Sequence, residues 1–250
     1  MASFALTYIG LLGIILFRYV LVAGLFWKAV WGRPAHKVGG TQLAKAAPTG
    51  QTMWREARTS MAVSLIYALP AAILIESWKR GGTAIYEGVP GLVDWLWMPV
   101  SVLIYLVLHD AYFYWTHRMM HHPRLYKATH HTHHLSKQPT PWAAFAFSPW
   151  EAAISAPFIP LLAFIIPIHI GAFLFLLTLM TFNSVANHSG WEILPRRFLD
   201  GPVGRHLITA RHHNLHHTRF KRNYGLYFRW WDHWMGTDDM SGDPMGRSAS

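Results

Sequence analysis

The sequence contains no cysteine, which excludes disulfide bonds, thiolate metal ligands and cysteine nucleophiles. Charge is also scarce, because Asp, Glu, Lys and Arg make up only 14% of the 250 residues, against about 25% in an average soluble domain. By contrast, 52% of the residues are hydrophobic. This composition predicts one integral-membrane domain over residues 1–250, in which any metal must be held by nitrogen or oxygen ligands.

Acidic residues are fewer than basic ones, which leaves a formal net charge of +10. Such an excess occurs in proteins that bind nucleic acid. Here, however, the basic residues lie mostly beside apolar segments rather than in a separate polar domain. Anionic lipid headgroups are therefore the expected partner of this charge, and nucleic acid is not.

Three segments are apolar over a length that can cross a bilayer as a helix. They comprise residues 3–27, 57–78 and 91–114. Residues 149–167 and 168–187 are two shorter apolar halves around the sequence PIHIG. They predict a helical hairpin that enters and leaves the membrane, with a single longer, broken helix as the alternative. The expected fold class is an all-α membrane protein with about three transmembrane helices plus this hairpin.

The segments between these helices set the expected orientation. Residues 28–58 and 79–90 contain Gly and Pro and lack apolar residues at helical spacing, so both are expected to be loops. Lys and Arg are concentrated in residues 28–58 and in the segments that flank the histidines. By the positive-inside rule these segments are cytoplasmic and the N-terminus lies outside. Residues 241–250 are expected to form a frayed tail.

Histidine is the residue type with unusual clustering. Of seventeen histidines, eight lie between positions 109 and 134 and five between 206 and 217. On a helix, Asp110, His117 and His121 would share one face, because they are separated by seven and four residues. The second and third boxes share a three-then-one spacing and predict further helical faces. These boxes comprise His130, His133 and His134, and His213, His216 and His217.

We interpret the three boxes as three ligand sets for one site. Neutral imidazole is a ligand for zinc, iron, copper and nickel, whereas calcium and magnesium need oxygen ligands. About nine histidines exceed what one tetrahedral ion can use, so two metals are expected. Because the first box follows an apolar helix, the substrate is expected to arrive from the lipid phase. The chemistry is then either hydrolytic, through a metal-bound hydroxide, or oxidative, through O2.

The ordered motifs resemble those of the fatty acid hydroxylase/sterol desaturase superfamily of integral-membrane non-haem di-iron oxygenases. They are, in order, HRMMHH at 117–122, HHTHH at 130–134, NHSG at 187–190, HNLHH at 213–217, NYG at 223–225 and WDHWMGT at 231–237. The resemblance covers residues 109–237. Residues 1–108 carry no motif and are expected to be mainly transmembrane stem, and residues 238–250 are expected to be a tail.

The resemblance implies a transmembrane stem, a cytosolic helical cap that carries the histidine boxes, and two irons that activate O2. Zinc is expected only if the protein is isolated in a substituted form. Asp110 and Asp232 would orient imidazoles from behind the ligands. The metal ligands carried over by motif are His117, His121, His130, His133, His134, His188, His213, His216 and His217. The residues left open between metal binding and a supporting role are His109, Asp110, His122, His131, His212 and Asp232.

The activity that the resemblance implies is hydroxylation or desaturation of a lipid, with O2 as co-substrate. The sequence does not distinguish the two reactions, because both use the same oxidant. They differ only in the position of the lipid's second C–H hydrogen relative to that oxidant. Sterol-like, fatty acyl and sphingoid lipids all fit. No haem-binding domain is recognisable in the chain, so electrons are expected from a separate carrier of ferredoxin or cytochrome b5 type, with its reductase. The oligomeric state is not indicated.

Two other functions fit part of the pattern. A metal ion transporter would use histidines as a relay, but it requires ionisable residues inside several membrane spans, and here the histidines lie mostly between or after the spans. A zinc-dependent membrane hydrolase stays open, because imidazole alone does not distinguish zinc from iron. Glu151 follows Ser148 and Pro149, and it either favours the N-terminus of a helix or belongs to the site.

Overall fold

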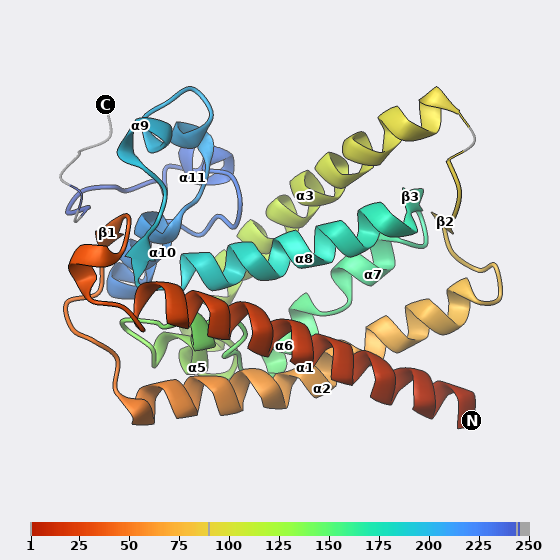
Figure 1. Cartoon of the computed structure of the whole chain (residues 1–250), viewed down its shortest axis with the longest axis horizontal. Coiled ribbons are helices and arrows are strands. Elements are labelled where there is room, and N and C mark those ends of the chain that lie inside the picture. The colour runs from red at the N-terminus through yellow and green to blue at the C-terminus, as the bar shows by residue number, and fades with distance from the viewer. Residues whose placement is uncertain (1, 90, 244, 246–250) are drawn as a thin grey trace.

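The computed structural model of the chain describes residues 2–89, 91–243 and 245, and almost all of its regular structure is helical (Figure 1). Within these residues, four helices are long and apolar enough to cross a membrane. They are α1 (Ala2–Val30), α2 (Gly50–Trp78), α3 (Leu92–Met120) and α8 (Ile170–Asn187). The prediction of an all-α membrane protein is therefore confirmed.

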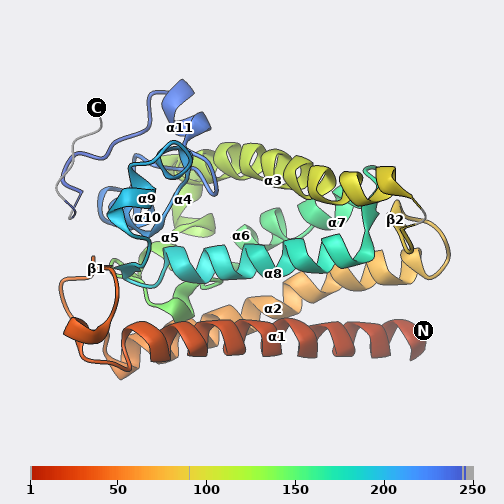
Figure 2. The same ribbon diagram turned by 45° about the horizontal axis from the view of Figure 1, so that its top comes forward.

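The four long helices form one bundle. Helix α1 packs along α2, and α8 lies between α1 and α3 and contacts both (Figure 2). A buried cluster at one end joins α2, α3 and α8 through Leu74, Tyr105 and Phe173. A second cluster joins α1 to α8 nearer the histidines, through Tyr19 and Val185. The bundle thus fixes the histidine-bearing ends of α3 and α8 beside each other.

Short helices and strands fill the connections and the C-terminal part. Strand β1 pairs with β4 in antiparallel orientation, and β2 pairs with β3 in parallel orientation. The short helices are η1 (Ala35–Lys37), α4 (Pro123–Thr129), α5 (His131–His134), η2 (Pro141–Ala143), α6 (Pro149–Ser155), α7 (Phe158–Leu162), α9 (Arg196–Leu199), η3 (Gly204–His206), α10 (Ala210–Arg219) and α11 (Trp230–Trp234). The strands are β1 (Thr41–Gln42), β2 (Ile85–Tyr86), β3 (Ile168–His169) and β4 (Trp191–Glu192).

The predicted hairpin is present, but its first half is broken. Helices α6 and α7 lead away from the histidines to β3, where Ile168 pairs with Ile85 of β2, and α8 then returns. Pro157 stands between the two short helices, and a proline lacks the N–H that a continuous helix would use. Only the returning half, α8, has the length of a membrane span.

One predicted helix start is wrong. Helix α2 begins at Gly50 rather than near residue 57, because Thr49 caps it by accepting a hydrogen bond from the Thr52 N–H at 3.2 Å. Its polar first turns are also held by tertiary contacts, since buried Glu56 accepts a hydrogen bond from the Thr140 hydroxyl at 2.5 Å. Helix α3 continues six residues beyond the apolar span to Met120, so it carries His117 and is capped by His121, as the expected helical spacing requires.

The predicted frayed tail is partly packed. Asp243 is buried and pairs with the Arg211 guanidinium at 3.2 Å, and the Arg219 guanidinium donates to the Ser241 hydroxyl at 2.7 Å. Residues 244 and 246–250 lie outside the described residues. The start of the tail is therefore attached to α10, which carries the third histidine box.

Candidate metal centre

Nine histidines from four helical regions meet at one end of the bundle. They come from the end of α3, from the α4–α5 junction, from the residue that follows α8, and from α10. Their ligand atoms form two sets, in each of which the atoms lie within 4.8 Å of one another. The first histidine group is His117, His121, His130, His134 and His216, and the second histidine group is His133, His188, His213 and His217.

The boxes do not correspond to the two groups. Consecutive residues on a helix point about 100° apart, so His133 and His134 face different groups, and so do His216 and His217. His130 does not share a helical face with His133, because it lies at the junction of α4 and α5 with φ −121°. The prediction of three ligand sets, one per box, is therefore wrong: the second and third boxes each contribute to both groups.

Backbone carbonyls fix the orientation of three rings. The Nδ1 atoms of His117, His188 and His216 lie 2.9, 2.7 and 2.7 Å from the carbonyl oxygens of Tyr224, Ser184 and Arg222. Because a carbonyl can only accept, each Nδ1 carries the hydrogen and donates it. Each Nε2 is then left with a lone pair that points into its histidine group.

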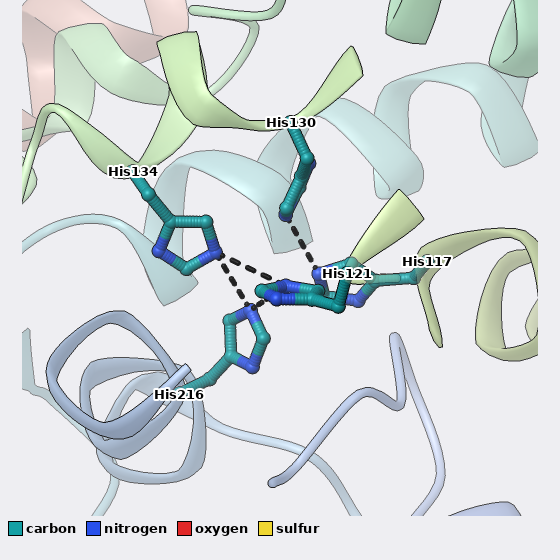
Figure 3. Close-up of side chains that lie close together, drawn as sticks. All are labelled: His117, His121, His130, His134 and His216. Atoms are coloured by element: carbon teal, nitrogen blue, oxygen red, sulfur yellow. Dashed lines mark hydrogen bonds between the residues drawn. The ribbon is translucent and has the colours of Figure 1, made fainter. Parts of the chain in front are cut away.

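The convergence of Nε2 atoms fits bound metal ions. In the first group, the Nε2 atoms of His121, His134 and His216 form a triangle with sides of 3.1 to 3.2 Å (Figure 3). A neutral ring carries one hydrogen, so a hydrogen on Nε2 could serve only one side of this triangle and the remaining lone pairs would repel. A cation at the centre would attract all three.

The spacing in both groups also suits metal coordination. A metal–nitrogen bond of about 2.0–2.1 Å places neighbouring ligand atoms about 2.8–3.4 Å apart, from octahedral to tetrahedral geometry. The Nε2 atoms of His133 and His188 are 3.2 Å apart, those of His188 and His213 are 2.8 Å apart, and those of His213 and His217 are 3.0 Å apart. The donor set of each group therefore fits an ion that prefers imidazole, such as iron or zinc.

Burial keeps these imidazoles neutral, which is the state that binds metal. It lowers the pKa of His188 and of His216 to about 4 and the pKa of His121 to about 2. Burial also lowers the pKa of the remaining ligand candidates outside the spanning helices, which are His130, His133, His134, His213 and His217. At neutral pH the site therefore offers lone pairs rather than positive charge.

Glu151 adds a carboxylate behind the first group. Its Oε1 atom lies 2.8 Å from Nδ1 of His130, and both side chains are almost fully buried. Burial raises the pKa of Glu151 well above its usual range. A metal cation bound to His130 would act in the opposite direction and favour the ionised carboxylate. Glu151 also lies in the first turn of α6, where its N–H donates to the Ser148 hydroxyl at 3.1 Å. It thus stands at the N-terminus of a helix, and its side chain lies beside the candidate site.

Asp110 and Asp232 do not act directly on imidazoles. One oxygen of Asp110 accepts hydrogen bonds from the N–H groups of residues 226–228, at 2.7 to 3.3 Å. The Asp232 oxygens accept from the Tyr224 and Gly225 N–H groups, at 2.8 and 2.7 Å, and from the Thr237 hydroxyl. The two aspartates fold residues 224–228, the site loop, whose Tyr224 carbonyl then orients His117. The expectation that they contact imidazoles is corrected in this way.

The remaining candidates lie outside both groups. His109 is buried, with Nδ1 2.9 Å from the Tyr227 hydroxyl. His122 is exposed and caps α4, and His131 is exposed as well. His212 is buried, and its Nδ1 accepts the Thr209 N–H at the start of α10. None of these four positions converges with the nine.

Sequence reasoning missed the carbonyls that hold the rings. Tyr224 stands out, because its ring also packs on His117, His121 and His216 with centroid separations of 5.6, 5.2 and 5.6 Å. The NYG motif marked this position without assigning a role to it. The carbonyls of Ser184 and Arg222 carry no sequence signal, since any residue supplies one. That the nine histidines bind metal stays a prediction, although the structure brings all nine together.

Comparison with known proteins extends this picture. The family model for fatty acid hydroxylase matches residues 102–237, which include all nine histidines. A Delta(7)-sterol 5(6)-desaturase of Gibberella zeae is 32% identical over 158 residues, covering 63% of this chain and 47% of that protein. The lathosterol oxidase of Mus musculus is 32% identical over 169 residues, covering 66% and 54%. A putative Delta(7)-sterol-C5(6)-desaturase of Arabidopsis thaliana is 31% identical over 195 residues, covering 76% and 66%.

The chain spans about half the length of the curated relatives that it matches. No solved structure matches it. The family match extends over more than half of the 250 residues and contains both histidine groups together with the site loop. The chain therefore belongs to the fatty acid hydroxylase family, within the fatty acid hydroxylase/sterol desaturase superfamily.

Proposed function

We propose that this protein is an O2-dependent membrane oxidoreductase that hydroxylates or desaturates a lipid at a centre of two irons. The observation that supports this most directly is the convergence of nine neutral imidazoles in two adjacent groups at one end of an apolar bundle. The relatives described above are sterol desaturases and lathosterol oxidases, and this supports the same reaction class.

Each histidine group would hold one iron. When bound, the two irons supply the activation of O2 and the removal of hydrogen from an unactivated C–H bond. The chain's own residues hold this centre in a fixed geometry: the carbonyls of Tyr224, Arg222 and Ser184 set the planes of three rings, and Glu151 sets a fourth. The rings of Phe147 and Phe220, 5.1 and 4.7 Å from His133 and His134, exclude water beside them.

The reaction needs electrons from outside the chain. Hydroxylation places one oxygen atom of O2 in the lipid and releases the other as water, with two electrons and two protons consumed. Desaturation removes two hydrogens from the lipid, and with two further electrons and two protons it releases both oxygen atoms as water. We propose a separate ferredoxin or cytochrome b5-type carrier, with its reductase, as the donor.

A sterol-like lipid is the substrate that the relatives favour, and fatty acyl and sphingoid lipids are the other candidates. The site lies where α3 and α8 end, so a lipid could reach it from the bilayer along the bundle. The groups that could hold a metal among the described residues are both at this end. A transporter would instead need ligands spread along its spans.

The test combines metal analysis with product analysis. The protein would be produced in cells that contain the candidate lipids and in matched cells without it, under labelled O2, and the lipids compared by mass spectrometry. The expected result is two irons per chain and either a labelled hydroxyl group or a new double bond in one lipid class. Zinc alone, with neither product in any lipid, would show that a hydrolase is the better assignment.

Two variants connect the activity to both groups. His133→Ala removes a ligand of the second group, and His216→Ala removes one of the first. We expect each variant to insert in the membrane and to lose its activity, with iron lost mainly from the altered group. Full activity in either variant would refute the assignment of that residue as a ligand.

A further inference from the structure

Large apolar side chains are exposed where α11 packs against the end of α3. Trp115 and Met119 of α3 are 48% and 44% exposed, and Trp234 and Met235 at the end of α11 are 61% and 38% exposed. We call these four residues the aromatic patch. They lie on the histidine side of the bundle, in a part of the chain that the metal centre does not use for ligands.

The patch is continuous across the two helices. The Trp231 ring lies between them, with its centroid 5.8 Å from that of Trp115 and 5.4 Å from that of Trp234. Trp231 also stacks on buried Tyr114 at 5.9 Å. Figures 1 and 2 both show α11 beside the histidine-bearing end of α3, and the two helices are in contact. The helix α11 therefore presents its exposed rings as an extension of the α3 surface.

The patch also continues the lipid-facing side of a membrane span. Trp115 follows exposed Leu108 by seven residues, and Met119 follows Trp115 by four, so all three share one face of α3. Farther along the same helix, about 140° around it from Leu108, Leu103 is 53% exposed. The face of α3 that carries Leu108, Trp115 and Met119 is thus apolar and exposed, as a lipid-facing side is, as far as Met119.

Cationic groups border the patch. Arg118 is exposed between Trp115 and Met119, and it donates a hydrogen bond to the Tyr114 hydroxyl at 3.0 Å. Arg222 is also exposed, and it donates to the carbonyl of Gly236, next to Met235, at 2.6 Å. Trp rings beside arginines are the combination that membrane–water interfaces favour, because the ring lies among headgroups and the guanidinium reaches phosphate.

We propose that α11 is an interfacial anchor, with the aromatic patch inserted in the headgroup region of the phospholipid bilayer that surrounds α3. The opposite side of α11 carries Asp232, which is fully buried and holds the N–H groups of Tyr224 and Gly225. The bilayer would thus support α11, whose Asp232 holds the site loop in place. The bound lipid is a structural contact, distinct from the substrate.

The absence of cysteine allows a direct test by site-directed spin labelling, because each single-cysteine variant carries one thiol. The full chain would be reconstituted in vesicles of phosphatidylcholine and phosphatidylglycerol, with labels at Trp234→Cys and, separately, at Met235→Cys. Leu103→Cys is the matched control in the bilayer. Lys137→Cys, exposed beyond the second histidine box, is the matched control in water. Power saturation would compare collisions with O2, which enriches in lipid, and with a water-soluble nickel complex.

We expect both α11 labels to resemble Leu103→Cys more than Lys137→Cys, with several-fold more collision with O2 than with the nickel complex. Labels at both α11 positions that collide with the nickel complex as Lys137→Cys does would overturn the anchor. Dipolar broadening between α11 labels of two chains, relieved by dilution with unlabelled protein, would assign the patch to a second copy instead and would also overturn it. Two neighbouring positions are used so that one poorly folded variant does not decide the outcome.

Discussion

At the scale of single residues, the two histidine groups differ in the carboxyl group that lies beside one of them. Glu151 lies 2.8 Å from His130 in the first group, whereas no described carboxylate lies at ion-pair distance from a ligand candidate of the second. A carboxylate behind an imidazole raises the basicity of that ligand. The first site should therefore hold its metal more tightly for a given number of ligands and should stabilise a higher charge on it.

This difference is tested with Glu151→Gln. Glutamine keeps the size of the side chain and can accept a hydrogen bond from Nδ1 of His130, but it removes the negative charge. We expect metal affinity at one of two sites to fall about 10-fold to 100-fold, measured by competition with a chelator. Glu56→Gln, at a carboxylate that is equally buried but bonded to Thr140, is the matched control and should leave both affinities unchanged. Equal affinities in the two variants would contradict the role of Glu151.

The same neutral imidazoles predict how stability depends on pH. Folded His188 and His216 have pKa values of about 4, and an unfolded histidine has a pKa of about 6.5. Between these values the unfolded chain binds more protons, so the free energy of unfolding decreases as the pH falls below about 6.5. We expect the metal-free protein to unfold at a lower urea concentration at about pH 5 than at about pH 7.5, and iron to enlarge the difference, because protons compete with the metal for Nε2 at the lower pH. A metal-free protein that is equally stable at both values would disprove this account.

At the scale of elements, the site loop is the segment that joins the histidines to the C-terminal region. Asp110 of α3 and Asp232 of α11 bind its amides from two sides, and its Tyr224 carbonyl accepts the His117 Nδ1–H. Gly225 is enclosed by these contacts. A Cβ at this position would lie 2.8 Å from the Phe228 carbonyl oxygen and 2.9 Å from an Asp232 oxygen. The glycine of the NYG motif is therefore required by space, not by backbone conformation.

Gly225→Ala tests this loop. Because the added methyl group must displace a backbone oxygen or the Asp232 carboxylate, we expect a loss of about 1–3 kcal/mol in the free energy of unfolding. We also expect weaker metal binding in the first group, since the Tyr224 carbonyl would shift. Gly39→Ala is the matched control, because a Cβ there meets no atom within 4 Å. If both variants unfold at the same denaturant concentration as the parent chain, the loop is not packed as described.

The elements also show which features the sequence could predict. The helical spacing of His117 and His121 is local, and α3 places both at its end as expected. The division of His133 from His134 was not predictable, because it depends on how α5 faces α8 and α10. The contacts of Asp110 were missed for a related reason: its partners lie 116 to 118 residues away. The start of α2 was misplaced because Thr140 and Ser136 stabilise its polar first turns from another part of the chain.

At the scale of the whole molecule, the bundle separates two ends with different chemistry. The histidines, the site loop and Lys137 lie at one end, and the loop between α2 and α3, which contains Arg80, lies at the other. Basic residues are more frequent in the segments at the histidine end. The positive-inside rule therefore predicts that this end is cytoplasmic, where a soluble electron carrier could reach it. An inverted protein would leave the centre without that source of electrons.

The orientation is tested with the single-cysteine variants Lys137→Cys and Arg80→Cys, since the chain has no thiol of its own. Both side chains are exposed, so either thiol can react when a reagent reaches its side of the membrane. A membrane-impermeant maleimide applied to intact cells should label Arg80→Cys and leave Lys137→Cys unmodified, and permeabilisation should make both reactive. Labelling of Lys137→Cys alone in intact cells would place the histidines outside. Because the proposed reaction draws two electrons per turnover from a cytoplasmic carrier, that result would also remove the proposed donor.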